Sequence, residues 1–227
     1  TFIGEKVRCI SHGIGPDNID IVITELDALA NVDLNTRQIR DEHRTLSMVR
    51  IGTSGALQPD ITLGTPVIAQ RSIGFDGVLN YYAGRDQVAD LDYEKALMKH
   101  TDWNPNWAKP YVVSADPELV AKIGKDDMLM GTTISAVGFY GPQGRRVRLD
   151  LANPDLNRRI EEFEYKGNRI TNYEMESAPL AGMGALLGHK CMTVCSIIAN
   201  RFNTEMNTNY KGGMRDLVAR VLERLTE

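Results

Sequence analysis

The chain has 227 residues, 42% of them hydrophobic and 25% charged, with a formal net charge of −4. This length and balance suit one folded domain with a sizeable core, and the mild acidity excludes bulk binding to nucleic acid or to an anionic membrane. The sequence has no apolar run near the roughly 18–20 residues that a membrane-spanning helix requires, and its start has no signal-peptide pattern.

Apolar runs and turn signals in the first half of the chain predict strands and one helix ahead of an irregular region. In order, they are a strand at Val7–Ser11, a turn at 12–16, a helix capped by Asp17 that runs to about Ala30, a strand at Leu46–Ile51 closed by a turn at 52–55, and a strand at Pro66–Arg71. Residues 72–115 are rich in Gly, Asn, Asp and aromatic side chains. We expect an irregular functional loop or an inserted subdomain there.

The second half of the chain is predicted to alternate helices with strands. In order, they are a helix near Pro117–Ile123, a strand near Met130–Val137, a helix opened by Asn153-Pro154 that runs to about Tyr165, a strand at Arg169–Asn172, a helix at Glu174–Leu187 closed by Gly188, a buried strand at Lys190–Ala199, and a helix from about Tyr210 to Leu225. With no internal repeat or linker, this alternation predicts one α/β domain over 1–227. Its sheet is expected to be largely parallel, with helices on both sides.

Polar residues follow two of the predicted strands, where ligands of open α/β sheets bind. Arg50 and Thr53, beside glycines at 52 and 55, would suit a phosphate through guanidinium, hydroxyl and backbone N–H groups. The simpler alternative is a surface Arg followed by a tight turn. After the second of these strands, Gln143 and Arg145 could form hydrogen bonds with a planar ring that bears two carbonyls and an N–H, while Phe139 stacks on the face of that ring. The alternative there is a Pro/Gly loop with a solvated Arg.

Two acidic residues mark a strand-to-helix junction in the segment 173–177. Either Glu174 or Glu176 could cap the helix, because carboxylates in a first turn interact favourably with the helix dipole. Residues two apart on a helix do not share a face, so we do not expect both to touch one ligand. One of them could accept hydrogen bonds from the vicinal hydroxyls of a sugar while the other holds structure. The glycines at 13 and 15 are a weak signal, because Asn18 stands where a dinucleotide motif needs its third Gly.

Metal and nucleophile motifs are missing from the sequence. It has no H-E-x-x-H, no C-x-x-C and no clustered His, so we expect no metal site. The scattered histidines are expected to be structural or at the surface: His12, His43, His100 and His189. The cysteines are odd in number, and two of them lie in apolar strand-like runs: Cys9, Cys191 and Cys195. Reduced, buried thiols in a cytoplasmic protein explain this pattern better than disulfides do.

Taken in order, GIG at 13–15, VRIGTSGALQP at 49–59, FYGPQGR at 139–145 and NYEMES at 172–177 resemble the nucleoside phosphorylase-I family, most closely its uridine phosphorylase branch. The resemblance covers nearly the whole chain. It implies a three-layer αβα fold with a mixed, largely parallel sheet. It also implies a cytoplasmic homo-oligomer, with a dimer as the unit or a hexamer built from it, in which neighbouring subunits complete the active sites.

The resemblance assigns roles to individual positions. Arg50 and Thr53 match the family's phosphate-binding residues, and Thr53 also lies near the ribose. Four residues match the family's base-binding residues: Phe139, Gln143, Arg145 and Arg201. Met175 matches the residue against the sugar, Glu176 matches the carboxylate on the ribose hydroxyls, and Glu174 matches its structural neighbour.

The resemblance implies reversible phosphorolysis of pyrimidine nucleosides in nucleoside salvage, in which uridine and phosphate give uracil and ribose 1-phosphate. Inorganic phosphate is the co-substrate and no cofactor is needed; Arg50, Arg145 and Glu176 carry the chemistry. Purine-cleaving relatives usually have Ser-Asp where this chain has Asn200-Arg201, and their Asp protonates the purine N7. A uracil leaving group depends less on a general acid, because Gln143 and Arg145 can stabilise the negative charge that develops on its carbonyl oxygens.

One departure concerns the phosphate site. In the family, an N-terminal strand ends in a Gly-Asp-Pro loop with an Arg close behind, and this sequence contains no such tripeptide. We therefore expect the chain to lack the N-terminal strand and phosphate loop and to build half of the phosphate site. The rival hypotheses are a hydrolytic nucleosidase on the same fold and a non-catalytic nucleoside-binding protein.

Overall fold

Three long strands, β5 (Ser47–Ala56), β6 (Pro66–Gly74) and β11 (Lys190–Asn200), form the centre of the computed structural model, which describes residues 2–3 and 7–227. Their apolar side chains Ile68, Ile73, Val194 and Ile197 are fully buried. Two further strands, β8 (Leu129–Ser135) and β10 (Asn168–Glu174), complete the core of the sheet. The predicted α/β class with a mixed sheet is confirmed.

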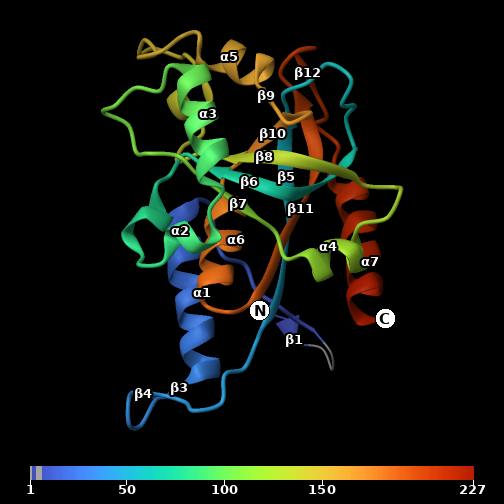
Figure 1. Ribbon diagram of the computed structural model, residues 1–227. Helices are drawn as coiled ribbons and strands as arrows, with labels where there is room; N and C mark the ends of the chain where they lie inside the picture. Colours follow the sequence, from blue (N-terminus) through green and yellow to red (C-terminus); the bar gives the residue numbers. More distant parts are fainter. Residues whose placement is uncertain (1, 4–6) are drawn as a thin grey trace.

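Five of these strands close into a ring. Strand β11 pairs parallel with β5 and antiparallel with β6, β8 pairs parallel with both β6 and β10, and β10 returns antiparallel to β5. Short strands extend the ring antiparallel: β7 (Tyr111–Ser114) on β6, β9 (Glu164–Tyr165) on β10, and β12 (Glu205–Met206) on β11. The sheet is thus curved onto itself, and Figure 1 shows its strands crossing at the centre of the molecule.

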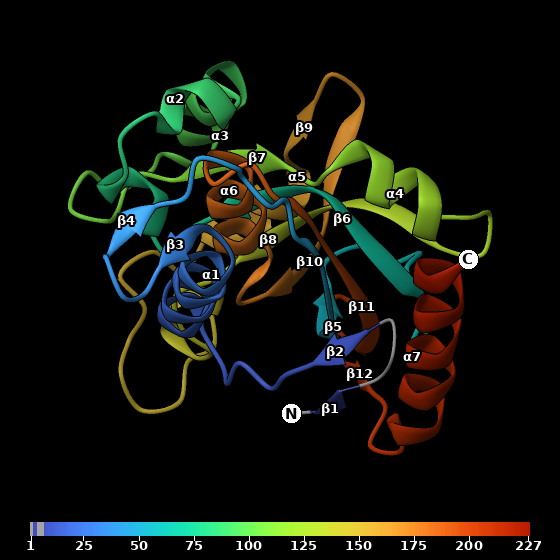
Figure 2. The ribbon, with the colours of Figure 1, turned by 90° about the horizontal axis from the view of Figure 1, so that it is seen from below.

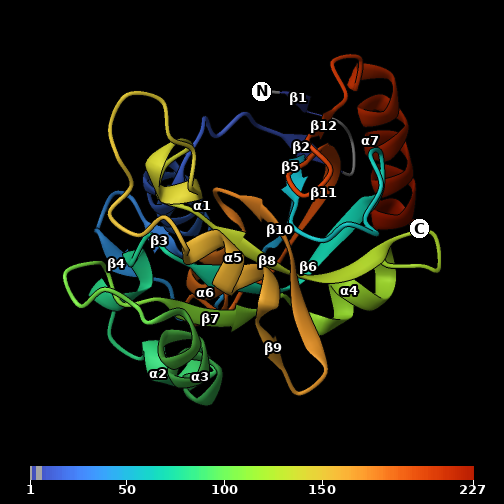
Figure 3. The same ribbon diagram turned by 90° about the horizontal axis from the view of Figure 1, so that it is seen from above.

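Helices cover the sheet from both sides, as predicted (Figure 2). On one side α1 (Pro16–Asn31) packs on α6 (Ser177–Leu186), and buried residues such as Ile19, Ile23 and Met183 join them. On the other side α4 (Pro117–Ile123) packs on α7 (Lys211–Thr226) through Leu119, Leu217 and Val221. The remaining α-helices are α2 (Arg85–Val88), α3 (Leu91–Thr101) and α5 (Leu156–Glu162). Figure 3 shows α2 and α3 side by side, and α3 packs against β7 and α5. In residues 2–3 and 7–227, no helix has the length and apolar character that crossing a bilayer demands.

Several predicted boundaries are wrong, each for a local reason. The turn expected at 52–55 is strand, because β5 continues there in parallel register with β11. Helix α1 has Gly15 as its N-cap and Asp17 in its first turn, without a side-chain cap. The helix expected from Glu174 begins at Ser177, because Glu174 ends β10 and Glu176 is the N-cap.

Other differences concern short elements. The strand expected at Val7–Ser11 is reduced to β2 (Arg8–Cys9), which pairs with β1 (Phe2–Ile3) outside the main sheet, just as β3 (Val32–Asp33) pairs with β4 (Gln38–Ile39). The helix expected up to Tyr165 ends at Glu162, because Phe163 is extended. The region 72–115, expected to be irregular, contains η1 (Val78–Tyr81), α2, α3 and β7. Helix α3 begins where Asp90 accepts a hydrogen bond from the Tyr93 N–H.

Candidate active site

Arg50 is the centre of a buried charged cluster on β5. Its Nη1 donates to a carboxylate oxygen of Glu174 at 2.9 Å and to Cys195 Sγ at 3.4 Å, and its Nη2 donates to Glu176. A Cβ at Gly52 would lie 2.9 Å from Nη2, so the glycine leaves room for the guanidinium to fold back along the strand. Burial acts to lower the pKa of Arg50, but Glu174, Cys195 and Glu176 outweigh it and raise that pKa. Arg50 is therefore a permanent cation.

Glu174 is held in one orientation at the end of β10. Its carboxylate accepts hydrogen bonds from Ser135 Oγ at 2.6 Å, Ser177 Oγ at 2.7 Å, and the backbone N–H groups of Glu176 at 2.8 Å and Ser177 at 2.9 Å. Its side chain is 1% exposed. So many donors make Glu174 a fixed anion that orients Arg50 and the start of α6.

Glu176 bridges Arg50 and the turn before α1. Its Oε1 accepts the Gly15 N–H at 2.6 Å, while its Oε2 accepts from Arg50. Burial raises the pKa of Glu176, Arg50 opposes that rise, and Glu174 adds to it. Both Glu174 and Glu176 contact the same arginine, Arg50. Helical spacing does not apply here, since one residue ends a strand and the other caps a helix.

A second cluster lies around Gln143 in η2 (Gly141–Gln143). The buried Oε1 of Gln143 accepts hydrogen bonds from Arg145 Nη1 at 2.6 Å and from Arg201 Nη2, and Arg201 Nη1 donates to the main-chain oxygen of Gln143. Two guanidinium groups thus occupy the acceptor of this side chain. What remains for a ligand is its amide N–H group, a donor.

Aromatic rings support both arginines of this cluster. The Arg145 guanidinium lies 3.8 Å from the ring centre of Phe139 and donates to the Phe139 carbonyl at 2.5 Å. The Arg201 guanidinium lies 4.7 Å from the ring centre of Tyr173. Burial lowers the pKa of Arg145, and burial together with the charge of Arg145 lowers the pKa of Arg201 to about 10. Two neighbouring cations of this kind form a strongly positive donor surface.

Strands β5 and β10 bring the two clusters together. On β10, Tyr173 supports Arg201, and the next residue, Glu174, holds Arg50. On β5, a Cβ at Gly55 would lie 3.6 Å from Arg201 Nε, five residues beyond Arg50. Thr53, three residues beyond Arg50 on β5, and Met175, between Glu174 and Glu176, are partly exposed. The fold therefore gathers the predicted phosphate, ribose and base residues into one region.

Comparisons with known proteins identify the family of this chain. The family model described as the phosphorylase superfamily matches residues 1–227. The chain belongs to the phosphorylase superfamily. The predicted resemblance is thereby confirmed.

The chain is similar to several named phosphorylases. It is 30% identical over 209 residues to the uridine phosphorylase of Salmonella typhimurium, covering 89% of this chain and 67% of that protein. It is 26% identical over 210 residues to the uridine phosphorylase of Thermococcus kodakarensis, covering 90% of this chain and 61% of that protein. The fold matches the crystal structure of a Trypanosoma brucei nucleoside phosphorylase with a TM-score of 0.83 at 23% identity, covering 95% of this chain and 78% of the other.

The structure adds residues to this candidate site that sequence reasoning missed. Cys195, Ser135 and Ser177 contact Arg50 or Glu174, but nothing near them in the sequence shows it, because the contacts depend on how β11, β8 and α6 are placed. Gly15 has a sequence signal, the Gly-Ile-Gly turn, whose role is to hold Glu176. His12 lies in the same turn with its side chain partly buried, and burial together with the charge of Arg50 lowers the pKa of its imidazole.

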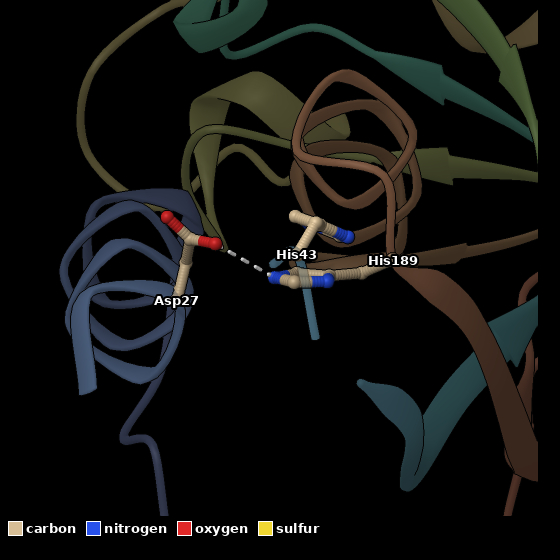
Figure 4. Close-up of side chains that lie close together, drawn as sticks. All are labelled: Asp27, His43 and His189. Atoms are coloured by element: carbon tan, nitrogen blue, oxygen red, sulfur yellow. Dashed lines mark hydrogen bonds and ion pairs between the residues drawn. The ribbon is translucent and has the colours of Figure 1, made fainter. Parts of the chain in front are cut away.

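Asp27, His43 and His189 form a separate cluster that could in principle hold a metal ion (Figure 4). His189 Nδ1 accepts the Leu46 N–H at 3.2 Å, so its Nε2 carries the proton and donates to Asp27 at 3.1 Å. His43 stacks on His189 and hydrogen-bonds the carbonyl of Leu187 at 2.9 Å. A metal-bound His normally donates from its other nitrogen, whereas here that nitrogen is an acceptor. The cluster suits a structural link between α1 and the start of β5.

Proposed function

We propose that this chain catalyses the reversible phosphorolysis of pyrimidine nucleosides, with uridine and inorganic phosphate giving uracil and ribose 1-phosphate. The observation that carries the proposal is the joining of two clusters through Tyr173 and Glu174. One cluster offers hydrogen-bond donors at Gln143 and Arg145, and the other pairs a cation at Arg50 with a carboxylate at Glu176. Uracil carbonyls, a phosphate and a ribose diol are the groups that match these side chains.

In the proposed mechanism, phosphate binds at Arg50 and Thr53 and attacks C1′ of the ribose as the C1′–N1 bond breaks. Glu176 accepts hydrogen bonds from the ribose hydroxyls and fixes the sugar, while Met175 lies against it. Negative charge grows on the uracil carbonyl oxygens, where Arg145 and the Gln143 amide donate to them. The side chains supply positioning and charge, with phosphate as the co-substrate and without a cofactor.

The end of β11 supports a pyrimidine substrate. Asn200 is buried in structural hydrogen bonds, because its amide donates to the carbonyls of Gln58 at 2.9 Å and Ile61 at 2.8 Å. Its oxygen accepts the N–H groups of Phe202 and Asn203. Arg201 is therefore the residue of this segment that faces the base cluster, and an arginine does not protonate a purine N7 at neutral pH.

The chain spans 61% of the length of its Thermococcus kodakarensis relative. We extend the proposal to a cytoplasmic protein of nucleoside salvage and to a homo-oligomer, with a dimer as the unit or a hexamer built from it, whose neighbouring subunits complete each site. Exposed apolar side chains near the charged turn, Ile14 at 75% and Ile10 at 43%, support a contact with another subunit. Sedimentation velocity would show this as a mass of at least twice that of the chain.

The deciding experiment incubates the protein with uridine or inosine, each with and without phosphate. We expect uracil release from uridine that depends on phosphate, and at least tenfold less base release from inosine. Release of uracil without phosphate would identify a hydrolytic nucleosidase. Uridine binding by calorimetry without release under either condition would identify a nucleoside-binding protein.

A further inference from the structure

Asn157 is the second residue of α5, and from there it hydrogen-bonds two residues of the base cluster. Its Nδ2 donates to the main-chain oxygen of Gln143 at 3.1 Å, and its Oδ1 accepts the hydroxyl proton of Tyr173 at 3.2 Å. A main-chain carbonyl can only accept, so the side-chain nitrogen must face Gln143 and the side-chain oxygen must face Tyr173. The Asn157 amide therefore links η2 to strand β10 in one orientation.

Gly144 lets this amide approach the end of η2 closely. Its φ is +71°, in the left-handed region that favours glycine, and a Cβ there would lie 2.2 Å from Asn157 Nδ2. A larger residue at this position would push the amide away from the Gln143 carbonyl. The side chain of Asn157 thus fits the turn by contact at Gly144 as well as by its hydrogen bond.

Helix α5 gives Asn157 a firm support. Leu156 and Ile160 are buried in the same core cluster as Tyr173, so the start of the helix is fixed against β10. The N-cap of α5 is Asp155, so Asn157 does not cap the helix. Both residues that Asn157 hydrogen-bonds lie outside α5. Its amide therefore acts on the base cluster rather than on the helix that carries it.

Four residues form a closed cycle of contacts in the base cluster. Asn157 contacts Gln143 and Tyr173, as described above. Arg201 contacts the same two residues, because it donates to the main-chain oxygen and to Oε1 of Gln143 and its guanidinium lies over the Tyr173 ring. Asn157 is neutral, so it supplies a second donor to the Gln143 carbonyl without adding a third cation beside Arg145 and Arg201.

We propose that Asn157 is a positioning residue for base recognition, which fixes the Gln143 main chain against Tyr173 and so sets where the Gln143 amide meets the pyrimidine. The inference rests on the proposed function for its substrate. Asn157 acts on the base through Gln143, whose side-chain oxygen is occupied by two arginines and whose N–H group is left for a ligand. A hydrogen bond weakens steeply as its geometry departs from the optimum, so a displaced Gln143 should bind the base less well.

The test measures binding of uridine and of inorganic phosphate separately, by titration calorimetry on the full chain. Asn157→Ala should weaken uridine binding about five- to tenfold, the scale of one lost hydrogen bond. Phosphate affinity should stay within about twofold of the parent, because the residues expected to bind phosphate, Arg50 and Thr53, lie on β5. The matched control is Asn168→Ala, because the exposed Asn168 bonds only the nearby Lys166 carbonyl and should leave both affinities unchanged.

A second substitution tests the link itself. Tyr173→Phe keeps the ring under Arg201 and removes the hydroxyl that donates to Asn157, so uridine binding should weaken about two- to fivefold. In the Asn157→Ala background the same change should cost less than about twofold more, because the link is already broken. Fully additive effects of the two substitutions would overturn the inference.

Two further results would also overturn it. One is unchanged uridine affinity in Asn157→Ala. The other is an equal loss of uridine and phosphate affinity, because that would indicate a general loosening of the fold. Urea unfolding shows whether each variant is folded. If Asn157→Ala does not fold, Asn157→Ser takes its place under the same criteria, because its shorter side chain stays polar but cannot span both partners.

The outcomes separate the inference from the proposed function. The proposed function fails if the parent protein releases no uracil from uridine, and uridine binding by calorimetry still decides the role of Asn157 in that case. A parent protein that does not bind uridine would overturn both. In an active parent, Asn157→Ala should raise KM for uridine and leave KM for phosphate unchanged.

Discussion

Arg50 and Glu176 hydrogen-bond each other across 126 residues of sequence, although the two are assigned to different substrates. Arg50 is expected to bind phosphate, and Glu176 is expected to bind the ribose hydroxyls. Bound phosphate must replace Glu176 as a partner of Arg50, and bound ribose must replace Arg50 as a partner of Glu176. Binding of either substrate therefore breaks the Arg50–Glu176 hydrogen bond and leaves the other residue available for the second substrate. We expect phosphate and uridine to strengthen each other's binding.

The Arg50–Glu176 pair should show energetic coupling in a double-mutant cycle. Arg50→Met should lower the free energy of unfolding by about 3–5 kcal/mol, because it leaves two buried carboxylates without their cation. Adding Glu176→Gln to that variant should recover part of the loss, so the single effects should not add. Urea unfolding at pH 7 measures all four proteins, and effects that add within about 0.5 kcal/mol would contradict the coupling.

Gly52 should be required for the folded-back position of Arg50. In Gly52→Ala the new Cβ would lie 2.9 Å from the guanidinium, which must shift away from Glu176. We expect a higher KM for phosphate and a loss of about 1–3 kcal/mol in stability, as for other overpacked sites. Gly213→Ala in α7 meets no atom within 4 Å and serves as the control, with stability equal to the parent or slightly higher. Parent-like phosphate kinetics in Gly52→Ala would refute the prediction.

Arg145 should matter for catalysis more than for folding. Removing a donor to a developing negative charge costs roughly 10²–10³-fold in rate, so Arg145→Ala should lower kcat/KM for uridine by that order. Arg146 is the matched control, since it lies next in the chain and pairs with Asp150 where both side chains are exposed. Arg146→Ala should stay within twofold of the parent. Equal activity of Arg145→Ala and the parent would disprove the base-site assignment.

Asp76 should make stability fall as pH rises from 5 to 7. Burial raises the pKa of this carboxyl to about 6, against hydrogen bonds from the Val78 N–H and Tyr111 that lower it. Because the folded pKa is above the unfolded one, the folded state binds the proton more tightly, and its stabilising effect is lost as pH rises through 6. The cost of Asp76→Asn should therefore be about 1 kcal/mol smaller at pH 7 than at pH 5. Urea unfolding that gave the same cost at both pH values would contradict this.

The sequence predicted best those elements whose own residues decide their structure. Strands β6 and β11 are rich in apolar residues, and α4 begins with an Asp-Pro pair that caps it. Helix α3 was missed because its region is rich in Gly, Asn and aromatic residues, and the capping residue Asp90 is not distinctive there. The continuation of β5 through 52–55 was missed because small residues are typical of turns, whereas pairing with β11 keeps them extended.

The candidate site was predictable residue by residue but not in its contacts. Motifs and resemblance pointed to Arg50, Gln143, Arg145 and Glu176. Their actual partners depend on tertiary placement, as in the contact of Cys195 with Arg50. The partly buried His12, which we expected to be structural or at the surface, belongs to the turn before α1, whose Gly15 N–H contacts Glu176.

The closed ring of strands has a consequence for how the protein is made. Strand β11 completes the ring by pairing with β5 and β6, but it is synthesised more than 110 residues after them. Until it emerges from the ribosome, the hydrogen-bonding edges of β5 and β6 that it covers stay open to other chains. Contacts so distant in sequence also slow folding. Newly made chains should therefore depend on chaperones until β11 has been translated.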